Sequence, residues 1–480
     1  MNKLGIIAVL GALAACAPES TETVLSADWK GTAKLEKKVS NPLVDFNFTA
    51  DPTAVEHEGR LYVYATNDQQ QCDEKGPDSE NTYERIKSLA MMSTEDMVNW
   101  TWHGTIDVGT IAPWIIASWA PSATSRVEED GKTHFYLYFS NSGAGTGVLT
   151  ATSPTGPWTS PLEKSLVDTD TPGNEDCEHP FDPGVVIDDQ GTGWLTFGAG
   201  VGKIVRLGKD MTSLDSPVTP IPVRFHFEAN EINFINGTYV YTYNTDWQDH
   251  SDWDLDVAPP TTCCMSYMTT KTPLETESWV YRDNYFKNPG ESGFDYSNNH
   301  THLHKYKGRW YLFYHSMNLR HHLGVKGGYR NVGVEEITVD ESTVTIDMVP
   351  ATYEGVSQIE NMDPFKLQQM ETTAGTKDVR FEPYGSIGNM TACSDGTGSV
   401  LVRGVDFRKK ARTLTMEATG TGRIEVREND PQGKVIAVMD IVSPEMSGTK
   451  VRLVSSPAGV TDLCFLFKGE ALRIDSWKFR

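Results

Sequence analysis

A glycine followed by an aromatic run returns five times between about residues 43 and 350, a stretch that shows no long helical period. The runs are GRLYVYATN from Gly59, GKTHFYLYFSN from Gly131, GTGWLTFGAG from Gly191, GTYVYTYNT from Gly237 and GRWYLFYHS from Gly308. About ten residues before each glycine lies a second strand-like segment, so each repeat reads as a β-hairpin. Hairpins repeated at roughly 45 to 70 residues are typical of β-propellers. We therefore expect an all-β chain in which residues 41–350 form a five-bladed β-propeller.

Ionisable residues stand where the first strand begins in four of the five blades, and in a propeller these positions lie at one mouth of the axial channel. The five first strands begin with Asp51, Trp119, Asp182, Glu228 and His300. Three carboxylates brought together repel one another, so we interpret them as a functional site. The alternative is that the two aspartates, each followed by proline, are turn residues.

Glu231 lies only three residues beyond Glu228, and residues three apart on a regular strand point to opposite faces. Glu228 precedes Gly237 by nine residues, as Asp182 precedes Gly191, whereas Glu231 has no counterpart at this spacing in the other blades. The sequence therefore favours Glu228 over Glu231 as the residue that faces the channel.

Two carboxyl groups across a concave site can act as one protonated acid and one ionised base, which is the machinery of glycoside hydrolysis. A third carboxylate nearby would raise the pKa of the acid by like-charge repulsion. Aromatic rings offer sugars flat apolar faces, and Trp119, Phe181 and Trp247 are the candidates. The polar segments 69–85 and 246–260 are expected to wall the pocket.

These motifs resemble glycoside hydrolase family 43, whose members are five-bladed propellers that hydrolyse terminal pentosyl and related linkages with inversion. The resemblance is carried, in the family's order, by NPLVDFNFTADPTAVEHEGRLYVYATND, SWAPSA, FDPGVVIDDQGTGWLTFG, FEANEINFINGTYVYTYNT and NNHTHLHKYKGRWYLFYH. It implies that Asp51 is the general base and Glu228 the general acid. It also implies that Asp182 orients the acid and tunes its pKa.

The same resemblance implies two further features of the site. GGYRNVGVEEI matches the segment that supplies a substrate-facing arginine, here Arg330. His300, with His302 second, matches the histidine that in the family often lies beside a bound calcium ion. Calcium in the channel is thus possible, while the chemistry itself is expected to need no cofactor.

We expect an inverting exo-glycosidase that releases terminal α-L-arabinofuranosyl residues from arabinoxylan-type hemicellulose of plants or algae. β-D-Xylosyl, galactofuranosyl and galactosyl linkages stay open, because the motifs fix the reaction better than the sugar. A hypothesis from another class is a non-catalytic glycan-binding surface lipoprotein.

The last part of the chain reads as a second β-domain. Residues 351–376 are interpreted as a linker rich in Thr and Ser, and residues 377–480 as a β-sandwich of the jelly-roll type. GVDF, GRIEVREN and IDSWKF resemble carbohydrate-binding module family 6. Tyr384 and Trp477 are the nearest candidates for sugar stacking, although Trp477 reads better as a core residue.

The overall charge and the N-terminus bear on partners and location. Lys and Arg number 42 against 65 Asp and Glu, and this formal net charge of −23 argues against nucleic acid as a partner. Residues 1–16 read as an export signal whose LAAC ending is similar to a lipobox, with Cys16 lipidated and residues 17–40 as a tether. An ordinary secretory signal is the alternative. We expect a monomer that contacts the bacterial envelope membrane only through this lipid, on the outer membrane.

Overall fold

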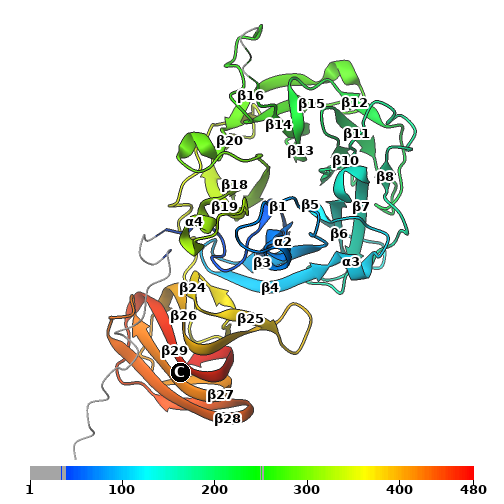
Figure 1. Ribbon diagram of the computed structural model, residues 1–480. Helices are drawn as coiled ribbons and strands as arrows, with labels where there is room; N and C mark the ends of the chain where they lie inside the picture. Colours follow the sequence, from blue (N-terminus) through cyan, green and yellow to red (C-terminus); the bar gives the residue numbers. More distant parts are fainter. Residues whose placement is uncertain (1–33, 35–38, 249, 251–252) are drawn as a thin grey trace, which may run out of the picture.

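The computed structural model describes residue 34 and residues 39–248, 250 and 253–480. Cys16 and the predicted export signal lie outside the described residues. Figure 1 shows a ring of small β-sheets around a central axis, joined on one side to a second β-domain. Within the described ranges, no helix is both long enough and apolar enough to cross a membrane.

Five antiparallel sheets form the ring and confirm the five-bladed propeller. Blade 1 contains β1 (Ala50–His57), β2 (Arg60–Thr66), β3 (Ser88–Thr94) and β4 (Trp100–Asp107), and blade 2 contains β5 (Trp119–Val127), β6 (Thr133–Ser140), β7 (Gly145–Ala151) and β8 (Val167–Asp168). Blade 3 contains β9 (Gly184–Ile187), β10 (Gly193–Phe197), β11 (Gly202–Arg206) and β12 (Thr219–Ile221), and blade 4 contains β13 (His226–Ile235), β14 (Thr238–Thr245), β15 (Met265–Thr270) and β16 (Val280–Phe286). Blade 5 contains β17 (Thr301–Tyr306), β18 (Arg309–Ser316) and β19 (Asn331–Ile337).

Short elements occupy the connections between these strands. They are the α-helices α2 (Asp68–Lys75), α3 (Val108–Ile111) and α4 (Asn318–Leu323), the 3₁₀ helices η1 (Ser142–Ala144), η2 (Thr276–Ser278) and η3 (Pro289–Ser292), and the strand pair β20 (Val339–Asp340) and β21 (Thr345–Ile346). Of these, α2 follows β2 with one residue between them, at the end of blade 1 where β1 starts.

The repeat glycines are explained by the hairpin turns they form. All five have a positive φ, between 73° and 80°. In blades 1, 4 and 5 the preceding residue also has a positive φ, at Glu58, Asn236 and Lys307. Two successive positive φ values are those of a type I′ turn, which matches the twist of the strands it joins and strongly favours glycine.

The ring is closed by the segment that enters the propeller. Leu43 N donates to Val332 O at 2.9 Å and Thr49 N donates to Arg330 O at 2.9 Å, so residues 43–49 run beside the start of β19. Blade 5 thereby gains main-chain partners from the opposite end of the domain. This closure also fixes the backbone of Arg330 next to the start of β1.

The second domain is a β-sandwich built from long, bent strands. They are β24 (Gly375–Lys377), β25 (Arg380–Pro383), β26 (Met390–Phe407), β27 (Thr413–Glu428), β28 (Val435–Arg452) and β29 (Gly459–Phe479). Trp477 is 1% exposed and packs on Phe465 and Phe479, so it belongs to the core. The connection between the domains is hydrogen-bonded to both of them, because β22 (Gln368–Gln369) pairs with β29 and β23 (Thr372–Thr373) pairs with β4.

Candidate active site

The first strands of blades 1, 2 and 4 carry the same β-bulge near their start. In β13, Glu228 pairs with Asn244 but Glu231 pairs with Thr242, so a step of three residues faces a step of two. The equivalent steps run from Ala50 to Thr53 in β1 and from Trp119 to Ser122 in β5. The first residue inside each bulge has a positive φ, namely Asp51 (50°), Ala120 (26°) and Ala229 (63°), and so does Asp182 (54°) just before β9. Such values are uncommon for residues other than glycine and cluster at functional sites.

This register corrects the alignment expected from the glycine spacing. Ala229, rather than Glu228, is the counterpart of Asp51 and Asp182, and Glu228 stands one residue earlier. The two aspartates therefore start from the same backbone position in their blades, while the glutamate starts from the preceding one. The Glu228 side chain, which is longer than that of an aspartate, therefore leaves the strand one residue before the position with the positive φ.

The bulge also overturns the expectation that Glu231 points away from the channel. Glu231 is 1% exposed, and its Oε1 accepts a hydrogen bond from Ser122 Oγ at 3.1 Å and lies 2.9 Å from Nδ1 of His302. Ser122 and His302 belong to the first strands of blades 2 and 5, so Glu231 lies among the inner strands. A regular strand would have alternated the two glutamates, and the bulge removes that alternation.

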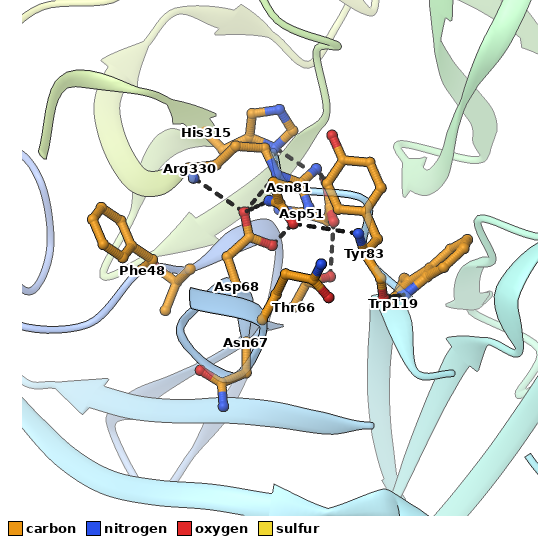
Figure 2. Close-up of polar contacts among 12 residues, drawn as sticks. Phe48, Asp51, Thr66, Asn67, Asp68, Asn81, Tyr83, Trp119, His315 and Arg330 are labelled. Atoms are coloured by element: carbon orange, nitrogen blue, oxygen red, sulfur yellow. Dashed lines mark hydrogen bonds and ion pairs between the residues drawn. The ribbon is translucent and has the colours of Figure 1, made fainter. Parts of the chain in front are cut away.

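Asp51 lies in a buried polar cage at the start of β1 (Figure 2). Its carboxylate accepts hydrogen bonds from Arg330 Nη1 at 3.0 Å and Thr66 Oγ1 at 2.7 Å, and His315 Nδ1 lies 3.1 Å from Oδ1. Burial alone would raise the pKa of Asp51, but the charge of Arg330 and the contact with His315 outweigh it. They hold the pKa well below its ordinary value of 3.8. Asp51 is therefore an ionised carboxylate at neutral pH.

Arg330 is held from two further sides. Asp68, the first residue of α2, accepts hydrogen bonds at 2.9 Å from both Nε and Nη2 of Arg330, and its Oδ2 also accepts from the Arg330 main-chain N–H. The ring of Tyr83 covers the guanidinium, with Arg330 Cζ 4.7 Å from the ring centroid. The Asp68–Arg330 and Arg330–Asp51 contacts are drawn in Figure 2. Arg330 thus bridges the helix and the candidate base.

We expect Asp68→Asn to lower kcat/KM for an aryl glycoside substrate by about 10- to 100-fold, because a small displacement of Arg330 misplaces Asp51. The amide keeps a hydrogen-bonding partner but removes the charge that balances the buried guanidinium. Steady-state kinetics and thermal melting check this expectation together. Asp189→Asn, in an exposed turn of blade 3, is the control. Wild-type kcat/KM for Asp68→Asn would contradict the positioning role.

Glu228 is half-buried and connects to Asp51 through two side chains. Asn298 Nδ2 donates to Glu228 Oε1 at 2.9 Å, and Asn298 Oδ1 lies 3.5 Å from Nη1 of Arg330, which in turn binds Asp51. Burial and the charge of Asp51 raise the pKa of Glu228 to about 7, against a lowering by the Asn298 hydrogen bond. One carboxyl of the pair is therefore ionised and the other is protonated over a wide pH range.

Asp182 holds the bulge that carries Glu228. Its Oδ2 accepts a hydrogen bond from Ala229 N at 2.8 Å, and Ser140 Oγ donates to Oδ1 at 3.2 Å. Burial and the charges of Glu228 and Asp51 raise the pKa of Asp182 well above its ordinary value. Asp182 therefore acts on the acid through the backbone of Ala229 and through the charge interaction that the two carboxyl groups share.

His300 lies between the two aspartates. Its Nδ1 is 3.7 Å from Asp51 Oδ1 and 4.0 Å from Asp182 Oδ2, and burial lowers its pKa to about 4. Calcium prefers six to eight oxygen ligands, but both carboxylates are already engaged and the Arg330 cation binds one of them. Among the described residues, no group of three or more His, Cys, Asp or Glu side chains is arranged to hold a metal. The residues around His300 therefore do not fit a protein-ligated calcium ion.

The aromatic residues expected to contact sugar lie in three places. Trp119 is half-buried, and its Nε1 donates to Tyr83 O at 3.0 Å, so it stands beside the Arg330 cage. Phe181 is half-buried next to Asp182 in the chain. Trp247 is 40% exposed and meets the ring of Phe227, the residue before Glu228, at 6.5 Å. Trp119 is therefore near Asp51 in space, Phe181 is next to Asp182 in the chain, and Trp247 contacts the residue that precedes Glu228.

The structure adds residues that the sequence analysis missed, namely Asp68, Asn298 and His315. His315 Nε2 lies 2.7 Å from the main-chain oxygen of Asn298, so the two contacts of its ring connect Asp51 with the segment that binds Glu228. A signal was present, because Asp68 and His315 stand at or just after the end of an aromatic run. Tyr83 falls in segment 69–85, which was expected to wall the pocket.

The opposite pKa shifts predict the pH dependence of activity. A general acid works only while protonated, so kcat/KM should hold below the pKa of Glu228, about 7, and fall above it. Because the pKa of Asp51 lies well below its ordinary value of 3.8, the acidic limb of the pH profile should lie below pH 3.8. Asn298→Ala removes a hydrogen bond that lowers the pKa of Glu228, so its alkaline limb should move to higher pH. A wild-type alkaline limb near pH 4.5 would contradict the assignment.

Comparison with known proteins agrees with this geometry. Residues 39–344 match the model of Glycosyl hydrolases family 43. The chain is 34% identical over 482 residues to an arabinoxylan arabinofuranohydrolase of Bacillus subtilis (strain 168), covering 92% of each chain. It is 31% identical to one of Paenibacillus polymyxa, over 92% of this chain and 74% of that protein.

A solved structure extends the likeness to the whole fold. The crystal structure of a family 43 arabinoxylan arabinofuranohydrolase from Bacillus subtilis, in complex with cellotetraose, superposes with a TM-score of 0.84 at 32% identity. The match covers 92% of this chain and 97% of that one, and so includes both domains. The chain therefore belongs to glycosyl hydrolases family 43 and is a glycoside hydrolase.

Proposed function

We propose that this enzyme is an inverting exo-glycosidase that releases terminal α-L-arabinofuranosyl residues from arabinoxylan-type hemicellulose. The observation that carries the reaction is the pair Asp51 and Glu228, one ionised and one protonated, joined through Arg330 and Asn298. The sugar is supported by the arabinoxylan arabinofuranohydrolases that match nearly the whole chain.

In the proposed reaction, Glu228 protonates the glycosidic oxygen of the leaving xylan chain. Asp51 accepts a proton from a water molecule that attacks the anomeric carbon from the opposite face. The bond from the anomeric carbon to the leaving oxygen breaks as the bond to water forms, so the configuration inverts. The reaction needs two carboxyl groups and water, and no cofactor. Asp182 keeps the Glu228 bulge in place.

Hydrolysis of para-nitrophenyl glycosides tests the choice of sugar. We expect α-L-arabinofuranoside to be the preferred substrate over β-D-xyloside and galactofuranoside, measured as kcat/KM for each. A preference for the xyloside or the galactofuranoside would replace the proposed sugar by one of those alternatives while leaving the two carboxyl roles intact. Activity on none of them would contradict the proposal.

We also propose that Cys16 is lipidated, that the enzyme is held as a monomer on the outer membrane, and that the second domain is a carbohydrate-binding module. The support is the lipobox-like sequence LAAC and the jelly-roll motifs. Labelled palmitate should be incorporated into the wild-type protein and not into Cys16→Ser. A wild-type protein that takes up no label would contradict the lipid anchor. Because the described residues offer no set of protein ligands for calcium, a calcium ion beside His300 would have to be bound almost wholly by water, and metal analysis of the purified enzyme that finds no calcium would rule it out.

A further inference from the structure

A groove of about 890 Å³ lies between the outer side of blade 1 and the loop that joins β25 to β26. Asn67, Gln70 and Asp73 line it from α2 and the residue before it, and Tyr384 and Ile387 line it from the loop. In Figure 1 this loop extends from the second domain along the outer strand β4. The volume is within the range of roughly 300–1,000 Å³ found for small-molecule sites. The two domains therefore form a groove that neither has alone.

The loop wall is fixed in place. Tyr384 N donates to Asn389 O at 3.0 Å, and Asn389 Nδ2 donates to Tyr384 O at 2.9 Å. His103 of β4 anchors it to the propeller, since its Nδ1 lies 2.6 Å from Gly388 O and burial lowers its pKa to about 4, leaving a neutral ring that donates. Tyr384 is nevertheless 39% exposed and Ile387 62% exposed. The wall offers apolar surface on a preformed support.

The groove begins next to the helix whose first residue holds Arg330. Asn67 precedes Asp68, which binds Arg330, so the first turn of α2 separates the groove from the active site. Figure 2 shows the Asn67 side chain pointing away from Arg330. Ser88, at the start of β3, and Asp107, at the end of β4, also line the groove and lie at the end of blade 1 where β2 leads into α2. The groove thus opens on the same end of the blade as the active site.

The lining chemistry indicates what the groove binds. Its exposed tyrosine and its amide and carboxylate side chains are groups that stack on sugar rings and hydrogen-bond to hydroxyls. Asp73, Glu74 and Asp107 make it acidic, and the described residues that line it include no lysine or arginine. Anionic ligands are therefore disfavoured. A neutral polyhydroxylated chain fits this surface.

We propose that this groove binds an unbranched, neutral stretch of the xylan main chain while an arabinofuranosyl branch of the same polymer occupies the axial site. The proposal rests on the proposed function. It makes the second domain part of the substrate site through one loop, with Tyr384 as the stacking platform. It predicts that the enzyme prefers the polymer to a small glycoside.

Binding to an inactive protein tests the groove directly. In the Glu228→Gln background, xylohexaose binding is measured by isothermal titration calorimetry with Tyr384 intact and with Tyr384→Ala. We expect the alanine to weaken binding by about three- to tenfold, and Tyr384→Phe to retain it, because the ring is what stacks. Unchanged binding on Tyr384→Ala, or no binding by the parent, would overturn the proposal. Thermal melting checks that both variants are folded.

Kinetics separate this proposal from the proposed function. In the otherwise wild-type enzyme, Tyr384→Ala should raise KM for arabinoxylan several-fold relative to its KM for para-nitrophenyl α-L-arabinofuranoside, which is too short to span both sites. An equal change in KM for both substrates, or no change in KM for arabinoxylan, would overturn the proposal that the groove binds the main chain. Failure of the wild-type enzyme to cleave the aryl arabinofuranoside would instead overturn the proposed function.

Discussion

Replacing Glu228 by Gln is expected to lower kcat on arabinoxylan by about 10²–10⁴-fold while leaving the fold intact, because the amide cannot donate the proton that the leaving oxygen needs. The substitution preserves size, and Gln Oε1 can still accept the hydrogen bond from Asn298. Because the lost proton is the one with a pKa of about 7, the alkaline limb of the pH profile should disappear together with the activity. Steady-state rates across pH, with circular dichroism as a check of folding, measure both effects.

The leaving group provides the control for this variant. A dinitrophenolate departs without protonation, so Glu228→Gln should retain far more of its activity on a dinitrophenyl arabinofuranoside than on the polymer. A general loss of structure would reduce both rates alike. Full activity on arabinoxylan, or an equal loss on both substrates, would contradict the role of Glu228 as the acid.

Replacing Asp51 by Ala is expected to lower kcat by about 10²–10⁴-fold on every substrate, whatever its leaving group, because no carboxylate then activates the attacking water. The effect extends beyond the lost base. Arg330 loses one of its two buried carboxylate partners but keeps Asp68, so the expected cost is below the about 3–5 kcal/mol of a buried charge left wholly unpaired. A lower melting temperature should therefore accompany the loss of rate. Kinetics on aryl glycosides and thermal melting measure the two losses separately.

Azide distinguishes the lost base from a damaged site. The small anion can occupy the space vacated by the carboxylate and attack the anomeric carbon directly, so it should restore turnover of Asp51→Ala and yield a glycosyl azide of inverted configuration. Glu228→Gln, which keeps its base, should not form this azide. An azide product of retained configuration would contradict the assignment of Asp51 as the base of an inverting enzyme.

The five blades could be predicted from sequence because each depends on local chemistry. A turn position that needs a positive φ strongly favours glycine, so the turn can be recognised in the sequence. The aromatic strands that follow Gly59, Gly237 and Gly308 can be recognised from their composition. The three carboxylates could be proposed because like charges brought together at equivalent points of a repeat repel one another unless a function uses them. These features require no knowledge of how the blades meet.

The parts that sequence reasoning missed depend on irregular backbone or on contacts across the ring. The bulge in β13 turns Glu231 toward the inner strands, and alternation along a regular strand gave the opposite expectation. Asp68 and Arg330 are separated by 262 positions, and only closure of the ring brings them together. The groove at Tyr384 likewise requires the docking of two domains.

The anomer released first tests the central claim most directly. Proton NMR of the hydrolysis of an aryl α-L-arabinofuranoside, recorded before mutarotation, should show β-L-arabinofuranose as the initial product, because water attacks opposite to the leaving group. Initial appearance of the α-anomer would show retention and contradict Asp51 as a base acting through water.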